Sequence, residues 1–390
     1  MKLKKIPTHV AFLLMAAALL LSACGGNSND SWAGLTLDSE QQFVYVANND
    51  KVVALDGLSG ATVWEYKRDT KFYAIPTIAD GVLYVGDYEG HVHAVDLEDG
   101  SSLWEYEAEI DKLIGPISTE PKDRVISGVA LDGDKVFFGL GGSDVVAVSR
   151  SSAEELWKFE TDHGVWGTPL YIPAGDADGV PVLYVASLDH HFYAINADTG
   201  EMLWRIDLEG AAPGNMLYDP LRNRVYVGTF GSELLAIDLA EQTIAARFET
   251  EAWVWDGPAL EVLENGTQML YLGDLEGNLY AVRVTEGGGL VQEWKRPVTD
   301  EALRATPLLL DDMVIVGSQD NRVYALNKTD GGELWDTETK GEVLSEMVAA
   351  SGDSESGEAL DLIIVSTSDN DELVLALDAA TGEKAWNYKD

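Results

Sequence analysis

Three tryptophans, an acid and an arginine could form a binding surface, because these tryptophans fall outside the regular spacing of the others. They are Trp166, Trp253 and Trp255, followed by Asp256 and, farther along the chain, Arg304. Indole rings can stack a planar ligand or anchor a partner segment, and nearby charges add specificity. The same rings could instead close the mouth of an internal channel as part of the core. The residue types alone leave both interpretations open.

Histidines lie close to acids at two places in the chain. His91 and His93 follow Asp87, and the pair at 190–191 follows Asp189. Imidazole and carboxylate groups are zinc ligands, but neither place supplies a complete ligand set at a recognised spacing. Histidines exposed to solvent in turns are the favoured interpretation, and no metal ligand is predicted.

Other patterns for catalysis or ion binding are incomplete. The segment DADG at 176–179 begins like a calcium turn but lacks the remaining ligands and the closing Glu, which favours an acidic surface turn. The sequence has no nucleophile-elbow pattern, no phosphate-binding glycine loop and no His-Glu-x-x-His pair. We therefore predict no catalytic and no cofactor-binding residue.

Cys24, the single cysteine, ends a segment typical of an export signal. A basic start precedes an apolar run at 10–21, which is too short to span a bilayer comfortably. The residues at 21–24 (LSAC) resemble the bacterial lipobox, at which the leader is cut and the cysteine is acylated. We predict a signal peptide over 1–23, a lipid anchor on Cys24 and a flexible tether over 24–31. The alternative is an ordinary secretory signal beside a chance cysteine.

The chain is strongly acidic. Its 67 Asp and Glu against 26 Lys and Arg give a net charge of −41. Such a surface repels phosphate backbones, which argues against a nucleic-acid partner. The charge serves solubility or attracts a basic partner.

Residues 32–390 consist of repeats with a period of about 40–50 residues, which is typical of propeller blades. A tryptophan closes seven of the repeats, and Ala246 holds its place in the fifth, which makes eight copies. The closing tryptophans are Trp64, Trp104, Trp157, Trp204, Trp294, Trp335 and Trp386.

Each repeat reads as four strands, because alternating β-branched and aromatic residues are separated by Gly, Asp and Asn at the bends. In the seventh repeat the expected strands are 304–310, 313–316, 322–326 and a segment around 334–336. One such sheet cannot cover both its faces, whereas neighbours around a ring can. The sequence therefore predicts an all-β fold, a single eight-bladed β-propeller of four-stranded antiparallel blades.

In such a ring, the loops that lead from one blade to the next line one rim of the central channel. These loops also contain Lys112 and His163. The side chains predicted to bind a partner or ligand are Phe72, Tyr73, Trp166, Trp253, Trp255, Asp256 and Arg304.

The repeated motif resembles the tryptophan-docking repeat of PQQ-like, quinoprotein-type propellers. Four copies are AINADTGEMLW from Ala194, AVDLEDGSSLW from Ala94, ALDAATGEKAW from Ala376 and ALDGLSGATVW from Ala54. The resemblance covers nearly all of 32–390. It implies a ring of eight blades in which each tryptophan packs against a neighbouring blade and each alanine fits tightly in a third strand.

Two branches of that family imply different functions. Quinone-dependent dehydrogenases are usually longer, and the alcohol enzymes typically carry adjacent cysteines and a calcium held by acidic and amide side chains. This sequence has no Cys-Cys pair and no segment matching their calcium or catalytic-Asp motifs. Length, lipobox and repeat number instead resemble BamB, the propeller lipoprotein of the outer-membrane barrel-assembly machinery. One departure is that the last repeat is complete through Trp386, which argues against a blade shared by the two chain ends.

We therefore expect a non-catalytic scaffold that binds an unidentified envelope protein, as a monomer within a complex and without PQQ. Its expected location is the periplasmic face of an outer membrane or the external face of a cell membrane. The alternatives are a PQQ-dependent oxidoreductase and a sensor of small ligands or carbohydrates.

Overall fold

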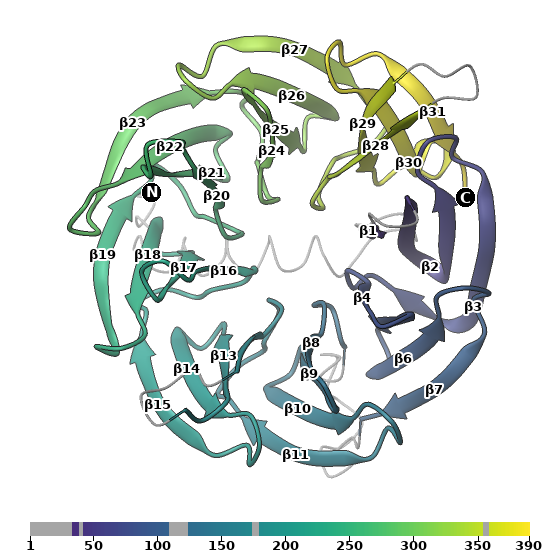
Figure 1. Ribbon diagram of the computed structural model, residues 1–390, viewed down its shortest axis with the longest axis vertical. Coiled ribbons are helices and arrows are strands. Elements are labelled where there is room, and N and C mark those ends of the chain that lie inside the picture. The colour runs from purple at the N-terminus through teal and green to yellow at the C-terminus, as the bar shows by residue number, and fades with distance from the viewer. Residues whose placement is uncertain (1–32, 39–41, 109–123, 174–178, 354–358) are drawn as a thin grey trace, which may run out of the picture.

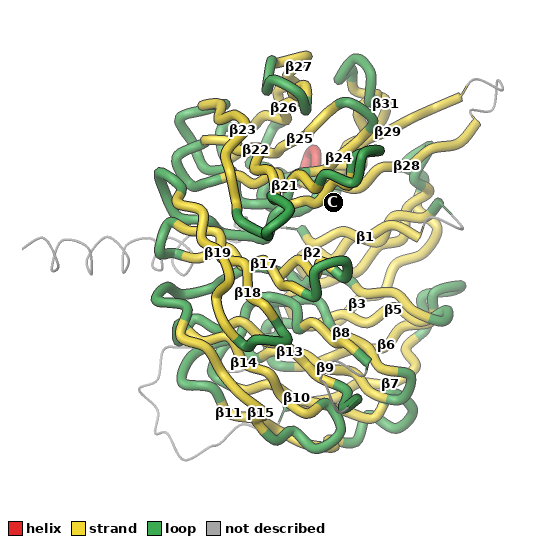
Figure 2. Tube along the Cα trace, turned by 60° about the vertical axis from the view of Figure 1, so that its left-hand side comes forward, coloured by secondary structure: helices red, strands yellow, loops and turns green. Residues whose placement is uncertain are grey.

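The computed structural model describes residues 33–38, 42–108, 124–173, 179–353 and 359–390. The predicted signal peptide, Cys24 and its tether, and Lys112, lie outside these ranges. In the described part of the chain the strands form eight antiparallel sheets arranged as blades around a ring (Figure 1), which confirms the predicted propeller. Strands and loops make up nearly all of it (Figure 2), and no described helix has the length and apolar character needed to cross a bilayer.

Each blade runs from an innermost first strand to an outermost fourth strand (Figure 1). Blade one contains β1 (Gly34–Asp38), β2 (Phe43–Asp56) and β3 (Thr62–Phe72); blade two contains β4 (Thr77–Ala79), β5 (Val82–Gly86), β6 (His91–Asp96) and β7 (Ser102–Glu107); blade three contains β8 (Ala130–Asp132), β9 (Lys135–Gly139), β10 (Asp144–Ser149) and β11 (Glu155–Glu160); blade four contains β12 (Leu170–Ile172), β13 (Val182–Ala186), β14 (His191–Asn196) and β15 (Met202–Asp207).

The second half of the ring follows the same order. Blade five contains β16 (Met216–Asp219), β17 (Arg224–Thr229), β18 (Glu233–Asp238) and β19 (Thr243–Glu249); blade six contains β20 (Ala259–Val262), β21 (Gln268–Gly273), β22 (Asn278–Val284) and β23 (Leu290–Pro297); blade seven contains β24 (Leu308–Leu310), β25 (Met313–Ser318), β26 (Arg322–Asn327) and β27 (Glu333–Glu338); blade eight contains β28 (Val348–Asp353), β29 (Ala359–Ser366), the 3₁₀ turn η1 (Asn370–Glu372), β30 (Val374–Asp378) and β31 (Lys384–Tyr388).

Blade one has the same plan although it contains three continuous strands. β1 pairs with residues 43–47 of β2, and β3 pairs with residues 49–55 of the same strand. The two ends of β2 meet, since the Gly57 N–H donates to the Gln42 carbonyl at 2.8 Å. Asn49, in the middle, has a φ of 49°. The halves of β2 thus occupy the second and third positions of a blade, with the turn at Asn49.

The core lies between the blades rather than on the ring axis. The central residues of the second and third strands are buried, because each sheet is covered by a neighbour on both faces. The buried side chains fall into eight described clusters, each shared by two adjacent blades, including one that joins blades eight and one.

The closing tryptophans lie on the fourth strands and reach the next blade. Trp157, for example, faces Ala147 across the sheet, and its Nε1 donates to the Ala197 carbonyl of blade four at 3.1 Å. Its ring lies over Gly200, whose φ of 73° and lack of a Cβ the contact requires. Trp64, Trp104, Trp294 and Trp335 donate to neighbouring blades in the same way.

Blades one and eight are separate sheets, so that no blade is shared by the two ends of the described chain. Polar contacts across this junction involve Lys51 Nζ, which lies 2.5 Å from Asp390 Oδ1 and 3.1 Å from the Tyr388 hydroxyl. Ser366 Oγ also donates to the Ala33 carbonyl at 2.7 Å. The ring is therefore closed by side chains between complete blades.

The first strand of blade seven is shorter than predicted. It covers 308–310 instead of 304–310, because Pro307 has no N–H for a ladder and disfavours continuation through the residue before it. Arg304 thus belongs to the preceding loop.

Candidate functional site

A hollow that is continuous with solvent lies at the centre of the ring. Its walls are the loops that lead into the first strands of blades two to eight. The lining residues are Tyr73, Ile75, Ile126, Ser127, Gly128, Trp166, Pro213, Gly214, Asn215, Trp255, Asp256, Arg304, Ala305, Leu344, Ser345 and Glu346.

A repeated contact fixes which loop residues face this hollow. In most of these loops one buried apolar residue packs on a glycine that is the last or second-last residue of the second strand of the preceding blade. Val254, for example, lies so close to Gly228 that a Cβ there would come within 2.5 Å of it. The residues after this anchor point toward the axis, as Trp255 and Asp256 do after Val254. The sequence thus sets the hollow's chemistry through the two or three residues after each anchor.

Two carboxylates from different blades meet beside an amide in this hollow. Asp256 Oδ1 accepts hydrogen bonds from the backbone N–H groups of Asn215, at 2.6 Å, and Gly257, at 2.9 Å. Asn215 Nδ2 donates to Glu346 Oε1 at 3.0 Å, and Asn215 Oδ1 accepts from the Thr168 N–H at 2.9 Å. Loops of blades four, five, six and eight are thereby linked through Asn215.

The two acids hold each other partly protonated. Surrounding protein raises the pKa of Asp256 by desolvation, and hydrogen bonds from Gly257 and Asn215 only partly oppose this. Desolvation raises the pKa of Glu346 to about 7, with the charge of Asp256 and a side-chain hydrogen bond to it acting in the same direction. Near neutral pH the pair therefore retains a proton.

An aromatic group with one guanidinium adjoins the acids. The Arg304 guanidinium lies 3.7 Å from the centre of the Trp255 ring, and burial lowers the pKa of Arg304 to about 10. The centroid of the Trp255 ring lies 6.4 Å from that of Trp166 and 5.5 Å from that of Phe230. Phe230 in turn stacks on Trp253 at 4.8 Å.

The structure brings together five of the predicted rim residues and places others elsewhere. Tyr73, Trp166, Trp255, Asp256 and Arg304 line the hollow. Trp253 lies outside the lining and reaches the group through Phe230, and His163 is exposed.

Phe72 does not belong to the rim. Its side chain is fully buried, because neighbouring side chains alternate in direction and Tyr73 takes the side facing the hollow. Sequence reasoning missed Asn215 and Glu346, which lie in different repeats. Counting from the buried anchor of each loop would have placed both at the axis.

The prediction of solvated turn histidines holds for some positions only. His190 is exposed and His191 is partly buried. His93 is 1% exposed and His91 is partly buried, since they lie on a third strand covered by a neighbouring blade. These two histidines are therefore interior groups, which corrects the prediction.

The oxygen atoms and charged side chains that line the hollow determine which ligands it could bind. The oxygens of Asp256, Glu346 and Asn215 are of the kind that calcium binds, once the shared proton is lost. PQQ, which carries several carboxylates, needs compensating cations. Among the described lining residues Arg304 is the one cationic side chain, and two acids stand beside it. The side chains of the lining alone therefore do not neutralise the carboxylates of such a cofactor.

Comparison with known proteins gives one family for most of the chain. The family model described as outer membrane protein assembly factor BamB matches residues 27–164, 165–306 and 291–390. BamB of Yersinia pestis is 22% identical over 300 residues, which cover 73% of this chain and 69% of that protein. The crystal structure of BamB from Moraxella catarrhalis has a TM-score of 0.61 at 17% identity and covers 87% of this chain and 94% of that chain. At this identity the structural likeness shows the fold alone.

Quinoprotein dehydrogenases match shorter stretches. The quinoprotein ethanol dehydrogenase of Pseudomonas aeruginosa is 32% identical over 150 residues, which cover 36% of this chain and 23% of that enzyme. The chain spans about a quarter of the length of the quinoprotein relatives that it matches.

Proposed function

Because this chain belongs to the family of the outer membrane protein assembly factor BamB, we propose that it is a non-catalytic, lipid-anchored scaffold that binds envelope proteins during outer-membrane protein assembly. The observation that carries this proposal is the extent of the match. It covers most of the chain and of BamB, whereas the quinoprotein match is confined to about a quarter of those enzymes. The fold leaves both functions open, since both kinds of protein share it.

The partner surface that we propose is the group of aromatic rings beside the central hollow, which consists of Trp166, Trp253, Trp255 and Phe230. The indole rings are half-buried and are fixed by contacts with neighbouring aromatic rings. Large aromatic side chains of this kind often contribute most of the binding energy at protein interfaces. The net charge of −41 favours a partner segment that carries basic residues on either side of the apolar side chain that contacts these rings.

Cells that lack this protein should contain less folded outer-membrane barrel protein, and the wild-type chain should restore it. The triple variant Trp166→Ala/Trp253→Ala/Trp255→Ala should restore little while keeping the ring fold. Leu203→Ala, which removes a side chain that is 39% exposed on the outer strand β15, is the matched control and should restore fully. Equal rescue by the triple variant would place the partner surface elsewhere, and no effect of the deletion would refute the assembly role.

The lipid anchor that we propose is tested separately. Cys24→Ser removes the chain's single thiol, so labelled fatty acid should disappear from the protein and the leader should remain attached. Label retained by the variant would refute acylation at this residue.

We propose that the protein works without PQQ. Purified chain supplied with PQQ, Ca²⁺ and an artificial electron acceptor should not oxidise alcohols or sugars, because the hollow offers acids where the quinone needs cations. Quinone-dependent turnover that Asp256→Asn abolishes would overturn both this proposal and the scaffold role.

The paired acids favour a second candidate, the binding of a small cationic ligand in the hollow. An organic ammonium compound could take the shared proton's place between Asp256 and Glu346 and stack on Trp255. A panel of such compounds should raise the melting temperature of the wild type and leave that of Glu346→Gln unchanged; equal shifts in both proteins would exclude this site.

A further inference from the structure

Two histidines lie inside the molecule where blades one and two meet. Asp87 directly follows β5, and His91 and His93 share one face of β6. Asp87 Oδ2 is 2.8 Å from His91 Nδ1 and 3.1 Å from His93 Nε2. The side chains of Asp87 and His93 are 0% and 1% exposed, whereas that of His91 is 17% exposed. The three groups converge in a site that opens to solvent beside His91.

The second ring nitrogen of His93 is held from both blades. Its Nδ1 lies 3.1 Å from the Tyr66 hydroxyl of blade one and 3.3 Å from Glu105 Oε2 on β7. Phe72 packs against the edge of the same ring, with centroids 5.1 Å apart. A partner on the non-ligating nitrogen is typical of metal-binding histidines, because it fixes the tautomer and the ring orientation.

The equivalent turn of blade six shows which contacts the fold itself requires. Asp87 Oδ1 accepts hydrogen bonds from two backbone N–H groups of its turn, both at 2.8 Å, and Asp274 Oδ1 accepts the equivalent two at 3.0 Å. The other oxygen of Asp274 accepts from Asn278 Nδ2 at 3.0 Å and from the Tyr280 hydroxyl at 2.8 Å. Neutral side chains satisfy the acid there, so the turn has no need of histidine.

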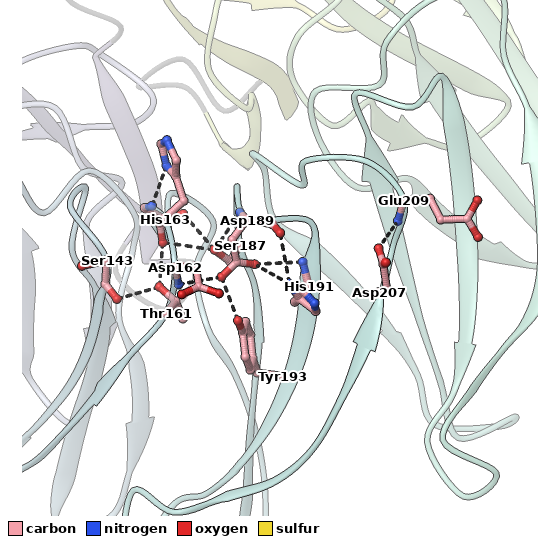
Figure 3. A network of polar contacts seen from close by, with 11 residues as sticks. Ser143, Thr161, Asp162, His163, Ser187, Asp189, His191, Tyr193, Asp207 and Glu209 are labelled. Atoms are coloured by element: carbon pink, nitrogen blue, oxygen red, sulfur yellow. Dashed lines mark hydrogen bonds and ion pairs between the residues drawn. The ribbon is translucent and has the colours of Figure 1, made fainter.

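Blade four has an intermediate arrangement (Figure 3). The Tyr193 hydroxyl donates to Asp189 Oδ2 at 2.8 Å, and His191 Nδ1 lies 3.3 Å from Asp189 Oδ1. This turn has one imidazole where blade two has two. Within the described ranges, the group in blade two is the one whose His and acid ligand atoms gather closely enough to hold a metal ion.

We propose that Asp87, His91 and His93 bind a zinc ion between blades one and two. Their three ligand atoms lie within 4.8 Å of one another, and a tetrahedral zinc with bonds of about 2.0 Å needs them about 3.3 Å apart. Small side-chain rotations therefore suffice. Each imidazole binds in its neutral form, with its proton on the ring nitrogen that faces away from the ion, and a water beside His91 takes the fourth position.

The ligand types select the ion. Two imidazole nitrogens and one carboxylate oxygen suit zinc, whereas calcium and magnesium prefer sites made of oxygens alone. All three proposed ligands belong to blade two, whereas the Tyr66 hydroxyl that orients His93 belongs to blade one. A bound ion therefore also links the two blades.

The test uses the full chain purified without a histidine tag. After incubation with zinc and dialysis against excess Ca²⁺ and Mg²⁺, which displace ions from the acidic surface, elemental analysis should find about one zinc per chain. The double variant His91→Asn/His93→Tyr, which copies the side chains of blade six, should fold and retain at least tenfold less zinc. Wild type without zinc, or a variant with as much zinc as the wild type, would refute the proposal.

Two further variants keep the result clear. His191→Asn makes the same type of change in blade four and should leave zinc retention unaltered; loss there would assign the ion to another site. Tyr66→Phe removes the hydroxyl that orients His93 and should weaken zinc affinity by about 10-fold or more by calorimetry. An unchanged affinity in Tyr66→Phe and in the single variant His93→Tyr would also refute the site, even if the double variant fails to fold.

Discussion

The circumference of the ring and its axis are both built from repeated segments, yet the side chains that recur on the circumference do not recur at the axis. On the circumference a fourth-strand tryptophan faces a third-strand alanine in seven described blades. At the axis, equivalent loop positions hold unlike side chains: Tyr73, Ile126, Trp166, Pro213, Trp255, Arg304 and Leu344. The tryptophan recurs because most blades use it for the same contact, packing on the next blade. The varied axial positions are free to serve binding.

Removing a docked tryptophan tests the circumference and has the largest expected effect. Trp157→Ala should lower the free energy of unfolding by about 3–5 kcal/mol, because it opens a cavity between blades three and four. Leu156→Ala, one residue earlier and 47% exposed on the other face, should cost less than about 1 kcal/mol. Chemical denaturation measures both; similar losses in the two variants would show that the tryptophan does not dock the blades.

Blade five is the exception that sharpens this comparison. Ala246 faces Ala236 there, and Arg224 from β17 reaches the next blade instead. Its Nη1 donates to the Gly288 carbonyl at 2.7 Å, and the guanidinium lies where a Cβ on Gly288 would be. Gly288 has a φ of 78°, like the glycines under the docked tryptophans. An arginine thus replaces the tryptophan at this junction.

Arg224→Ala should therefore destabilise the fold by about 2 kcal/mol, which is typical for loss of a largely buried hydrogen bond from a charged group. Arg224→Lys keeps the charge but loses the planar contact with Gly288, and should fall between wild type and Arg224→Ala. Denaturation midpoints give the order. Unchanged stability in both variants would mean that blade five docks by other contacts.

The same contrast explains what the sequence could reveal. Eight blades, the docked tryptophans and the strand order follow from spacing, because each repeat folds on local signals. Asn215, Asp256 and Glu346 meet only once the ring closes, so no local pattern joins them. The burial of His93 cannot be predicted from the sequence, because a third strand that is covered on both faces shows no alternation between buried and exposed positions.

At the axis, pH tests whether the two acids share a proton. The folded-state pKa values of both acids are raised, that of Glu346 to about 7, so the stability that Glu346 contributes is full below about pH 4.5 and declines as the pH rises through about 7. Glu346→Gln mimics the protonated acid at every pH. The difference in unfolding free energy between this variant and the wild type should therefore shift by about 1–2 kcal/mol in favour of the variant when the pH is raised from 5 to 8. Denaturation at both pH values checks this, and a constant difference would show that no proton is shared.

The smallest predicted effect separates two docked tryptophans that look alike. Trp335 and Trp386 are both half-buried, and each lies over a glycine of the next blade with positive φ, Gly382 and Gly60. Trp335 Nε1 donates to the Ala379 carbonyl at 3.1 Å, whereas Trp386 Nε1 has no hydrogen-bond partner among the described residues. Phenylalanine keeps most of the ring contact but has no N–H.

Trp335→Phe should therefore cost about 1 kcal/mol more than Trp386→Phe, because the first change leaves a carbonyl unpaired and the second removes an unpaired donor. The two substitutions delete the same atoms, so their loss of apolar contact largely cancels in the difference. Denaturation of both variants under one condition measures it. Equal losses would mean that docking on the circumference depends on ring contact alone, and a larger loss at Trp386 would mean that its N–H finds a partner when the ring closes between blades eight and one.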